Sequence, residues 1–201
     1  MKRQKILTKS VAAALQLAET EKWGSLTLAE IADEAGLSLK DVHGQVDKEA
    51  ISAAVETGWD AAMSEGSLDP DETARTRLFD VIMLRFEAME EVRDGAMSYL
   101  RWRDRTLDGL QLRVSARLAS AKWALVCAGL DRTQSVPRGV QITALAWAMA
   151  QAERAWREET SPDLSRTMAA LDAELIKIEE RLEWVGRLGK SRRSATEDDT
   201  A

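Results

Sequence analysis

The sequence contains one cysteine, Cys127, and one histidine, His43. A single cysteine excludes an internal disulfide and any metal site built from several cysteines, which favours a reducing cytoplasm. His43 has no nearby pattern of a nucleophile and an orienting acid, so no catalytic triad is indicated. The stretch "GRLGK" lacks the strand and the spacing of a phosphate-binding loop. We therefore expect no enzyme, no metal and no cofactor.

Long hydrophobic runs are also missing. The longest, "ALAWAMA", is far shorter than the ~20 apolar residues that span a bilayer. The basic start of the chain does not resemble a signal peptide, because Lys9, Ser10 and Gln16 interrupt its apolar residues. β-Branched residues are few, and no stretch alternates for long with a period of two. We expect a cytoplasmic, all-α protein.

Positive charge is not in excess, although proteins that bind nucleic acids often carry a basic patch. The net charge is −6, and the first fifty residues are slightly more acidic than basic. Because charge acts within ~8–10 Å at physiological salt, this balance argues only weakly against binding to DNA.

Helical patterns cover most of the chain, and the loop "SEGSLDP" separates the first four predicted helices from the later ones. We predict an N-terminal domain over residues 1–50, a helical ligand-binding and dimerisation domain over 51–188 and a disordered tail over 189–201. The predicted helices span residues 3–22, 27–35, 38–46, 48–64, 70–91, 94–105, 107–130, 137–159 and 162–188.

The stretch "TLAEIADEAGLSLKD" predicts a helix-turn-helix. Thr27 with Glu30, and Ser38 with Asp41, have the spacing of capping boxes that begin two helices. Gly36 between them allows the left-handed turn that ends the first helix. Such a pair places its second helix in the major groove of DNA.

The second of these helices has an apolar stripe of Leu39, Val42 and Val46, which we expect to be buried. The polar residues between them then face solvent and can contact bases or phosphates. A basic N-terminal arm and the two flanking helix starts can add contacts to phosphate. The predicted DNA-binding residues are Lys2, Arg3, Lys5, Thr27, Ser38, Lys40, His43, Gly44, Gln45 and Lys48.

Residues 5–51, through "ILTKSVAAALQLAETEKWGSLTLAEIADEAGLS" and "KEAI", resemble the DNA-binding domain of the TetR (tetracycline repressor) family. The resemblance implies a TetR-like fold, a ligand-responsive transcriptional regulator and a homodimer that binds a palindromic operator. The sequence departs from the family pattern at "VHGQVDKEA", where the family usually has an aromatic residue and a phenylalanine.

Residues 75–185 resemble in patches a second family, the lipid-binding accessory proteins of ubiquinone biosynthesis, which have a TetR-like fold. "RTMAALD" is the clearest patch. This resemblance implies an alternative function, in which the chain binds a lipid or isoprenoid and does not bind DNA.

Large apolar residues at helical spacing in the second part have two interpretations. They are either ordinary core or the wall of a cavity for an apolar small molecule or lipid. The candidate pocket residues are Phe79, Met83, Phe86, Met89, Trp102, Trp123, Cys127 and Trp147.

The last predicted helix carries a heptad seam that packs either within its own subunit or against a second copy. The seam consists of Leu171, Leu175, Ile178, Leu182 and Val185. We favour a twofold dimer through the last two helices, as in the TetR family. Contact with a membrane surface is the less favoured alternative, through Trp184, Arg187, Lys190, Arg192 and Arg193.

Overall fold

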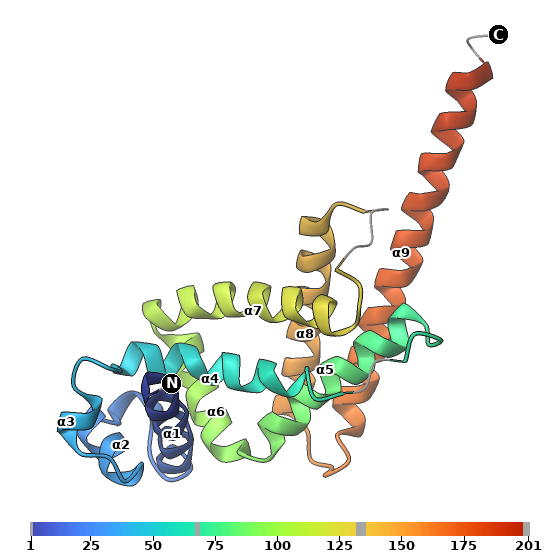
Figure 1. The fold of residues 1–201 in the computed structure, drawn as a ribbon. Helices are drawn as coiled ribbons and strands as arrows, with labels where there is room; N and C mark the ends of the chain where they lie inside the picture. The colour runs from blue at the N-terminus through green and yellow to red at the C-terminus, as the bar shows by residue number, and fades with distance from the viewer. Residues whose placement is uncertain (1, 67–68, 132–135, 199–201) are drawn as a thin grey trace.

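All regular elements in the described part of the chain are helices, which confirms the all-α prediction. A computed structural model describes the backbone of residues 2–66, 69–131 and 136–198, and the side chains of residues 3–66, 69–131 and 136–181. Figure 1 shows the α-helices of the described chain: α1 (Lys2–Leu17), α2 (Leu28–Glu34), α3 (Leu39–Val42), α4 (Lys48–Ala62), α5 (Ala74–Glu90), α6 (Arg93–Arg105), α7 (Leu107–Cys127), α8 (Arg138–Arg157) and α9 (Ser165–Asp198). A short 3-10 helix, η1 (Trp23–Ser25), follows α1.

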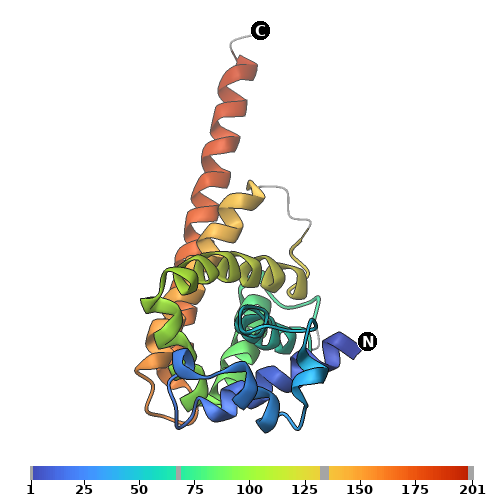
Figure 2. The same ribbon diagram turned by 90° about the vertical axis from the view of Figure 1, so that its left-hand side faces the viewer.

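The helices α1 to α3 form one end of the molecule, and α4 leads from them into the bundle of α5 to α9 (Figure 1). Figure 2 looks along α4 and shows the other helices arranged around it. The C-terminal half of α9 projects away from the rest of the molecule. No helix in the described ranges is long and apolar enough to cross a membrane.

Several helices are shorter than the sequence predicts. The helix α1 ends at Leu17 instead of residue 22, because the chain turns into η1. The helix α5 begins at Ala74 instead of residue 70, because the Thr73 hydroxyl caps it by accepting a hydrogen bond from the Thr76 amide. In contrast, α9 continues to Asp198 and so includes most of the segment predicted to be a disordered tail.

A cluster of aromatic side chains joins the N-terminal helices to the bundle. Trp23 is fully buried and packs edge-on against Tyr99, with 4.9 Å between the ring centroids. Its amide donates to the Ser98 hydroxyl at 3.1 Å, and its indole N–H donates to the Ser52 hydroxyl at 3.2 Å. One core therefore runs through both predicted domains. A smaller apolar cluster of Ile6, Ala32, Val42 and Val46 holds α1, α2 and the α3 turn together.

The helices α1 and α6 cross at Gly95. A Cβ atom at this position would lie 2.2 Å from the carbonyl oxygen of Leu15, far inside van der Waals contact. Only a hydrogen atom fits at this crossing, so glycine sets how closely α1 approaches α6.

A network of ion pairs occupies the middle of the bundle. Glu56 on α4 pairs with Arg85 on α5 and with Arg103 on α6, and Arg103 bridges to Glu153 on α8. The Arg103 guanidinium lies 2.6 Å from Glu56 and 2.7 Å from Glu153. Arg85 also pairs with Asp60. Because all of these side chains are largely buried, each charge requires its partners.

The network continues from Glu153 towards the surface between α7 and α8. Glu153 also accepts from Arg117 at 2.8 Å and from Arg157 at 2.6 Å, and Arg157 pairs with Asp104 at 2.7 Å. Burial raises the pKa of Glu153, but the guanidinium groups of Arg103, Arg117 and Arg157 outweigh it and bring the pKa to about 2.

The first part of the α9 heptad seam packs within its own subunit. Leu171 and Leu175 are buried in the core, and Ile178 is half-buried beside it. The side chains of Leu182 and Val185 lie outside the described residues, as do those of Trp184, Arg187, Lys190, Arg192 and Arg193.

The pKa of Glu153 predicts acid-dependent stability. An unfolded glutamate has a pKa of about 4.3, so the depressed pKa adds stability above that pH, which is lost as the pH falls towards 2. The contribution is about 3 kcal/mol. Urea unfolding at pH 7 and pH 3 should show Glu153→Gln less stable at pH 7 and less sensitive to pH than the parent protein.

The control is Glu158→Gln, because Glu158 forms only an exposed pair with Arg166. We expect this variant to keep the parent's pH profile. Equal stability of Glu153→Gln and the parent protein at pH 7 would contradict the predicted role of the network.

Candidate nucleic-acid interface

The helix α2 begins with the predicted capping box. The Thr27 amide and hydroxyl both donate to a Glu30 carboxylate oxygen at 2.7 Å, and the Glu30 amide donates to the Thr27 hydroxyl at 3.2 Å. Gly36 has a φ of 64° and makes the predicted left-handed turn after α2. This box and turn fix where the chain enters α3.

The helix α3 has its predicted capping box but consists of a single turn. The Ser38 hydroxyl donates to Asp41 at 2.6 Å and accepts from the Asp41 amide at 3.3 Å. The helix ends at Val42, whereas the sequence predicts a helix up to Val46. The chain leaves the helix in a turn at His43, which has a ψ of 124°, and Gly44, which has a φ of 67°.

The prediction that Leu39 is buried is wrong. Val42 and Val46 are buried as predicted, but the Leu39 side chain is 59% exposed. Leu37, just before the cap, packs against the small apolar cluster in its place. The exposed surface of α3 therefore presents an apolar side chain next to Lys40 and His43.

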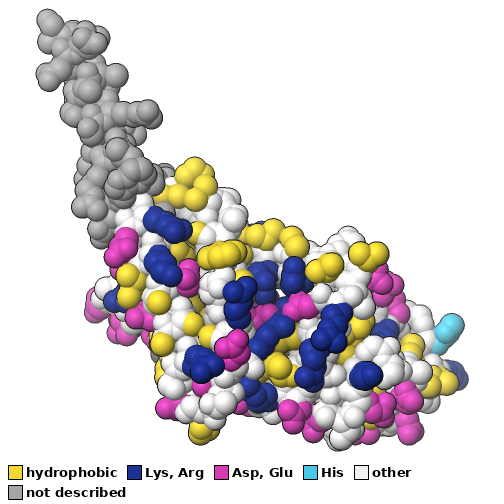
Figure 3. All heavy atoms as spheres, turned by 180° about the vertical axis from the view of Figure 1, so that it is seen from behind, with side chains coloured by type: hydrophobic (Ala, Val, Ile, Leu, Met, Phe, Trp, Pro, Cys, Tyr) yellow, Lys and Arg dark blue, Asp and Glu magenta, His cyan; other side chains and the backbone are white. Residues whose placement is uncertain are grey.

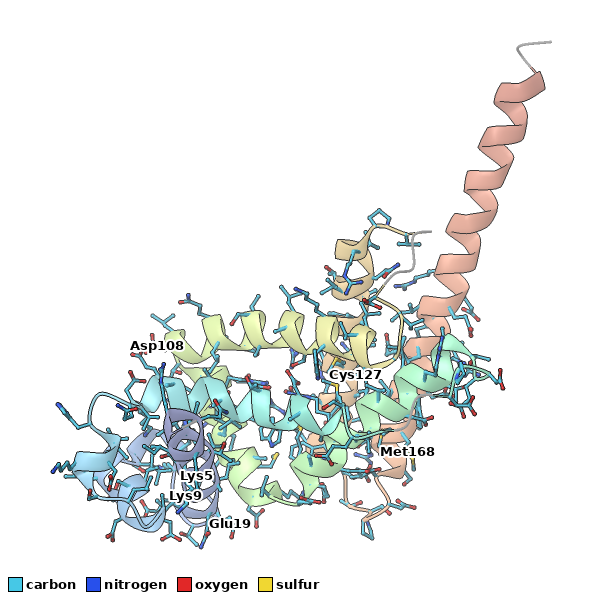
Figure 4. The ribbon with its side chains drawn as sticks, in the orientation of Figure 1. Lys5, Lys9, Glu19, Asp108, Cys127 and Met168 are labelled. Carbon is cyan, nitrogen blue, oxygen red and sulfur yellow. The ribbon has the colours of Figure 1, made fainter. Side chains whose placement is uncertain are left out.

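The basic residues before α3 belong to a helix. The sequence predicts an arm, but α1 begins at Lys2, whose side chain is not described. The Arg3 side chain donates to the Gln45 carbonyl at 2.9 Å and so ties α1 to the turn after α3. Lys5 is exposed, and Lys9 lies one helical turn further along α1 (Figure 4).

Lys48 does not extend into solvent as a phosphate contact requires. Its ammonium donates to the Trp23 carbonyl at 2.7 Å and to the Leu26 carbonyl. Burial lowers the pKa of Lys48, although the Glu30 carboxylate opposes this change. Lys48 thus holds the segment between η1 and α2, and its predicted role as a DNA contact is not supported by this geometry.

The eight predicted pocket residues, all in the described part of the chain, do not line one cavity. Met83, Phe86 and Met89 are buried in the core, whereas Trp123 and Trp147 are exposed on α7 and α8. The others are half-buried on three different helices: Phe79, Trp102 and Cys127. Figure 4 labels Cys127 on α7. The physical reason is that charged side chains occupy the middle of the bundle.

A surface groove between α7 and α8 was missed by the sequence analysis. It has a volume of about 570 Å³ and is lined by several arginines. Figure 3 shows basic side chains gathered between apolar ones on this face of the molecule. The spacing of arginines in the sequence does indicate this basic surface. Arg113 and Arg117 are four residues apart, and Arg154 and Arg157 are three apart, so each pair lies on one face of its helix.

The comparisons with known proteins identify the fold. No family profile and no curated protein matches the sequence. A TetR transcriptional regulator from Nitrosomonas europaea ATCC 19718 has 18% identity and a TM-score of 0.69, over 85% of this chain and 96% of that chain. A TetR transcriptional regulator from Rhodococcus sp. RHA1 has 17% identity and a TM-score of 0.57, over 85% and 95%. The chain therefore has the fold of TetR transcriptional regulators.

The second resemblance suggested by the sequence gains no support. No curated protein matches residues 75–185, and the two solved structures are both TetR regulators by their descriptions. The ubiquinone-related function is accordingly not favoured.

The left-handed turn after α3 leads to a test of local stability. An alanine at Gly44 meets no steric obstacle but must adopt a positive φ, which costs roughly 1–2 kcal/mol. Urea unfolding should show this loss for Gly44→Ala. In Gly58→Ala, on an exposed and ordinary turn of α4, the same change should be neutral or stabilising by up to ~1 kcal/mol. Equal effects at both positions would contradict the assigned turn.

Proposed function

We propose that this protein is a DNA-binding transcriptional regulator of the TetR type. The observation that carries the proposal is the capped pair of α2 and α3, which presents Leu39, Lys40 and His43 at an exposed end of the molecule. The shared fold of two proteins described as TetR transcriptional regulators supports it. Fold alone does not define function, so the proposal rests on this surface.

The exposed residues of α3 suit the major groove of DNA. Lys40 can donate to a guanine edge or a phosphate, and Leu39 can contact a thymine methyl group. Lys5 on α1 adds positive charge beside the turn that Arg3 holds. Acidic groups such as Asp47 oppose this charge and weaken the attraction to phosphate, and salt weakens it further, so we expect binding to be strongest at low salt.

We further propose a homodimer through α8 and α9. A groove between these helices is lined by Val140, Ala144, Trp147 and Ile178, among others. Val140 is 54% exposed and Trp147 61% exposed, seven residues apart and hence on one face of α8. Exposed apolar residues of this kind mark protein interfaces. A twofold dimer would present two copies of α3 to the two halves of a palindromic operator.

A small molecule is proposed to control DNA binding through the C-terminal bundle. Such an effector acts only if its affinity differs between the arrangements of the two heads. The ion pairs in the bundle disfavour a wholly apolar ligand there, because burying it would separate charged partners.

DNA binding can be tested by selecting sequences from a library of random duplexes, followed by gel shifts at low salt. We expect one palindromic sequence to be enriched and Lys40→Ala to weaken its binding about tenfold. Lys122→Ala, an exposed change on α7, is the control and should bind like the parent protein. If the parent protein enriched no sequence and shifted no duplex, the proposed function would be wrong.

Dimerisation can be tested by sedimentation equilibrium. Val140→Arg places a charge on the proposed interface and should raise the dimer dissociation constant at least ~tenfold. Leu107→Arg, at an even more exposed apolar position at the start of α7, should leave it unchanged. A parent protein that stays monomeric at high concentration, or a dimer insensitive to Val140→Arg, would disprove this interface.

A further inference from the structure

The groove between α7 and α8 has walls of two kinds. One is apolar and consists mainly of Val114 and Leu118 from α7 and Trp147 from α8. All three side chains are exposed in the single chain, and Val114 is 58% exposed. The other wall carries guanidinium groups from both helices, and Figure 3 shows basic side chains gathered on this face.

The charged wall has more cations than anions. The arginines that line it are Arg113, Arg117, Arg154 and Arg157, and its carboxylates are Asp104 and Glu153. Both carboxylates already accept from more than one arginine. Arg154 forms no ion pair within the described residues, and Arg113 lies 3.5 Å from its nearest acidic partner. Positive charge is therefore available in this groove, although the whole chain has a net charge of −6.

We propose that this groove binds a small amphipathic anion, with a carboxylate or phosphate head group and an apolar chain or ring. The head group would lie between Arg113 and Arg154, since guanidinium groups donate two parallel hydrogen bonds to either kind of anion. The apolar part would cover Val114 and Leu118 on α7. The volume of about 570 Å³ falls within the usual range for small-molecule sites.

A second copy of the chain fits this groove less well. In a twofold contact, the same surface of each copy faces the other, so arginines would approach arginines near the axis. Like charges across an interface oppose association, whereas an anion satisfies them. The charge of the groove thus favours a separate anionic ligand.

The groove connects to the interior through Glu153. Arg117 and Arg157 contact both the groove and Glu153, and Glu153 shares Arg103 with Glu56 on α4. An anion that draws Arg117 or Arg157 away from Glu153 would change the balance of charge next to Arg103. Binding in the groove would in this way affect α4, the helix that carries Glu56 and connects the bundle to the N-terminal helices.

Calorimetric titration of the full chain with octyl compounds tests the proposal. We expect octanoate or octyl phosphate to bind saturably, with one molecule per chain. Octanol, octylammonium and inorganic phosphate should each bind at least ~tenfold more weakly, because each lacks one half of the required chemistry. Comparing the two anions distinguishes a carboxylate ligand from a phosphate ligand.

Variants locate the site. The double variant Arg113→Ala/Arg154→Ala should weaken anion binding about tenfold or more without altering the circular dichroism spectrum. Arg101→Ala is the matched control, because Arg101 is exposed on α6 and lies outside the groove. Trp147→Phe should remove the change in tryptophan fluorescence that accompanies binding.

Three results would overturn the proposal: octanol binding as tightly as octanoate, anion binding unchanged in the double variant, or no binding of either anion. If the anions did not bind and Leu118→Glu converted a dimer to monomers, the groove would be a subunit interface instead. This inference deepens the proposed control by a small molecule and rests on it, but its test uses no DNA, so its failure is separate from a failure of the Lys40→Ala test.

Discussion

The balance of charge around Glu56 and Glu153 is the constraint on which the C-terminal helices depend. Two buried carboxylates can remain ionised only if several guanidinium groups stay within hydrogen-bonding distance. Those groups come from α5, α6, α7 and α8, while Glu56 itself comes from α4. A shift of any one of these helices would leave a charge without its partner. The same requirement fills the centre of the bundle with polar atoms, and the proposed ligand site lies instead at the surface between α7 and α8.

The features that the sequence predicts well depend on residues close together in the chain. The capping boxes of Thr27 and Ser38 and the turn at Gly36 involve partners five or fewer residues apart, and all are present. The ion-pair network was not predictable in this way, because Glu56 and Arg103 are separated by 47 residues. The surface proposed to bind DNA falls between these cases. Its outline follows from local signals, whereas the exposure of Leu39 depends on Leu37 filling the small apolar cluster.

Some of the basic side chains near α3 donate hydrogen bonds to backbone carbonyls within the chain. The Lys48 ammonium holds backbone carbonyls between η1 and α2, and the Arg3 side chain holds the turn after α3. Both residues were predicted to contact DNA from their position in the sequence. Their internal contacts stiffen the end of the molecule, and Lys40 is exposed on α3 itself. The proposed recognition of a duplex would therefore rely on shape and on few charges.

The crossing of α1 and α6 at Gly95 has a geometric consequence for the proposed dimer. Because α1 lies against α6 with space for a single hydrogen atom, a bulkier residue would tilt α1 about that point. A tilt of a few degrees at the pivot becomes a displacement that grows with distance towards α3. In the proposed dimer both copies of α3 would be displaced. One methyl group at position 95, far from the DNA, would then change the angle at which the two copies of α3 meet the double helix.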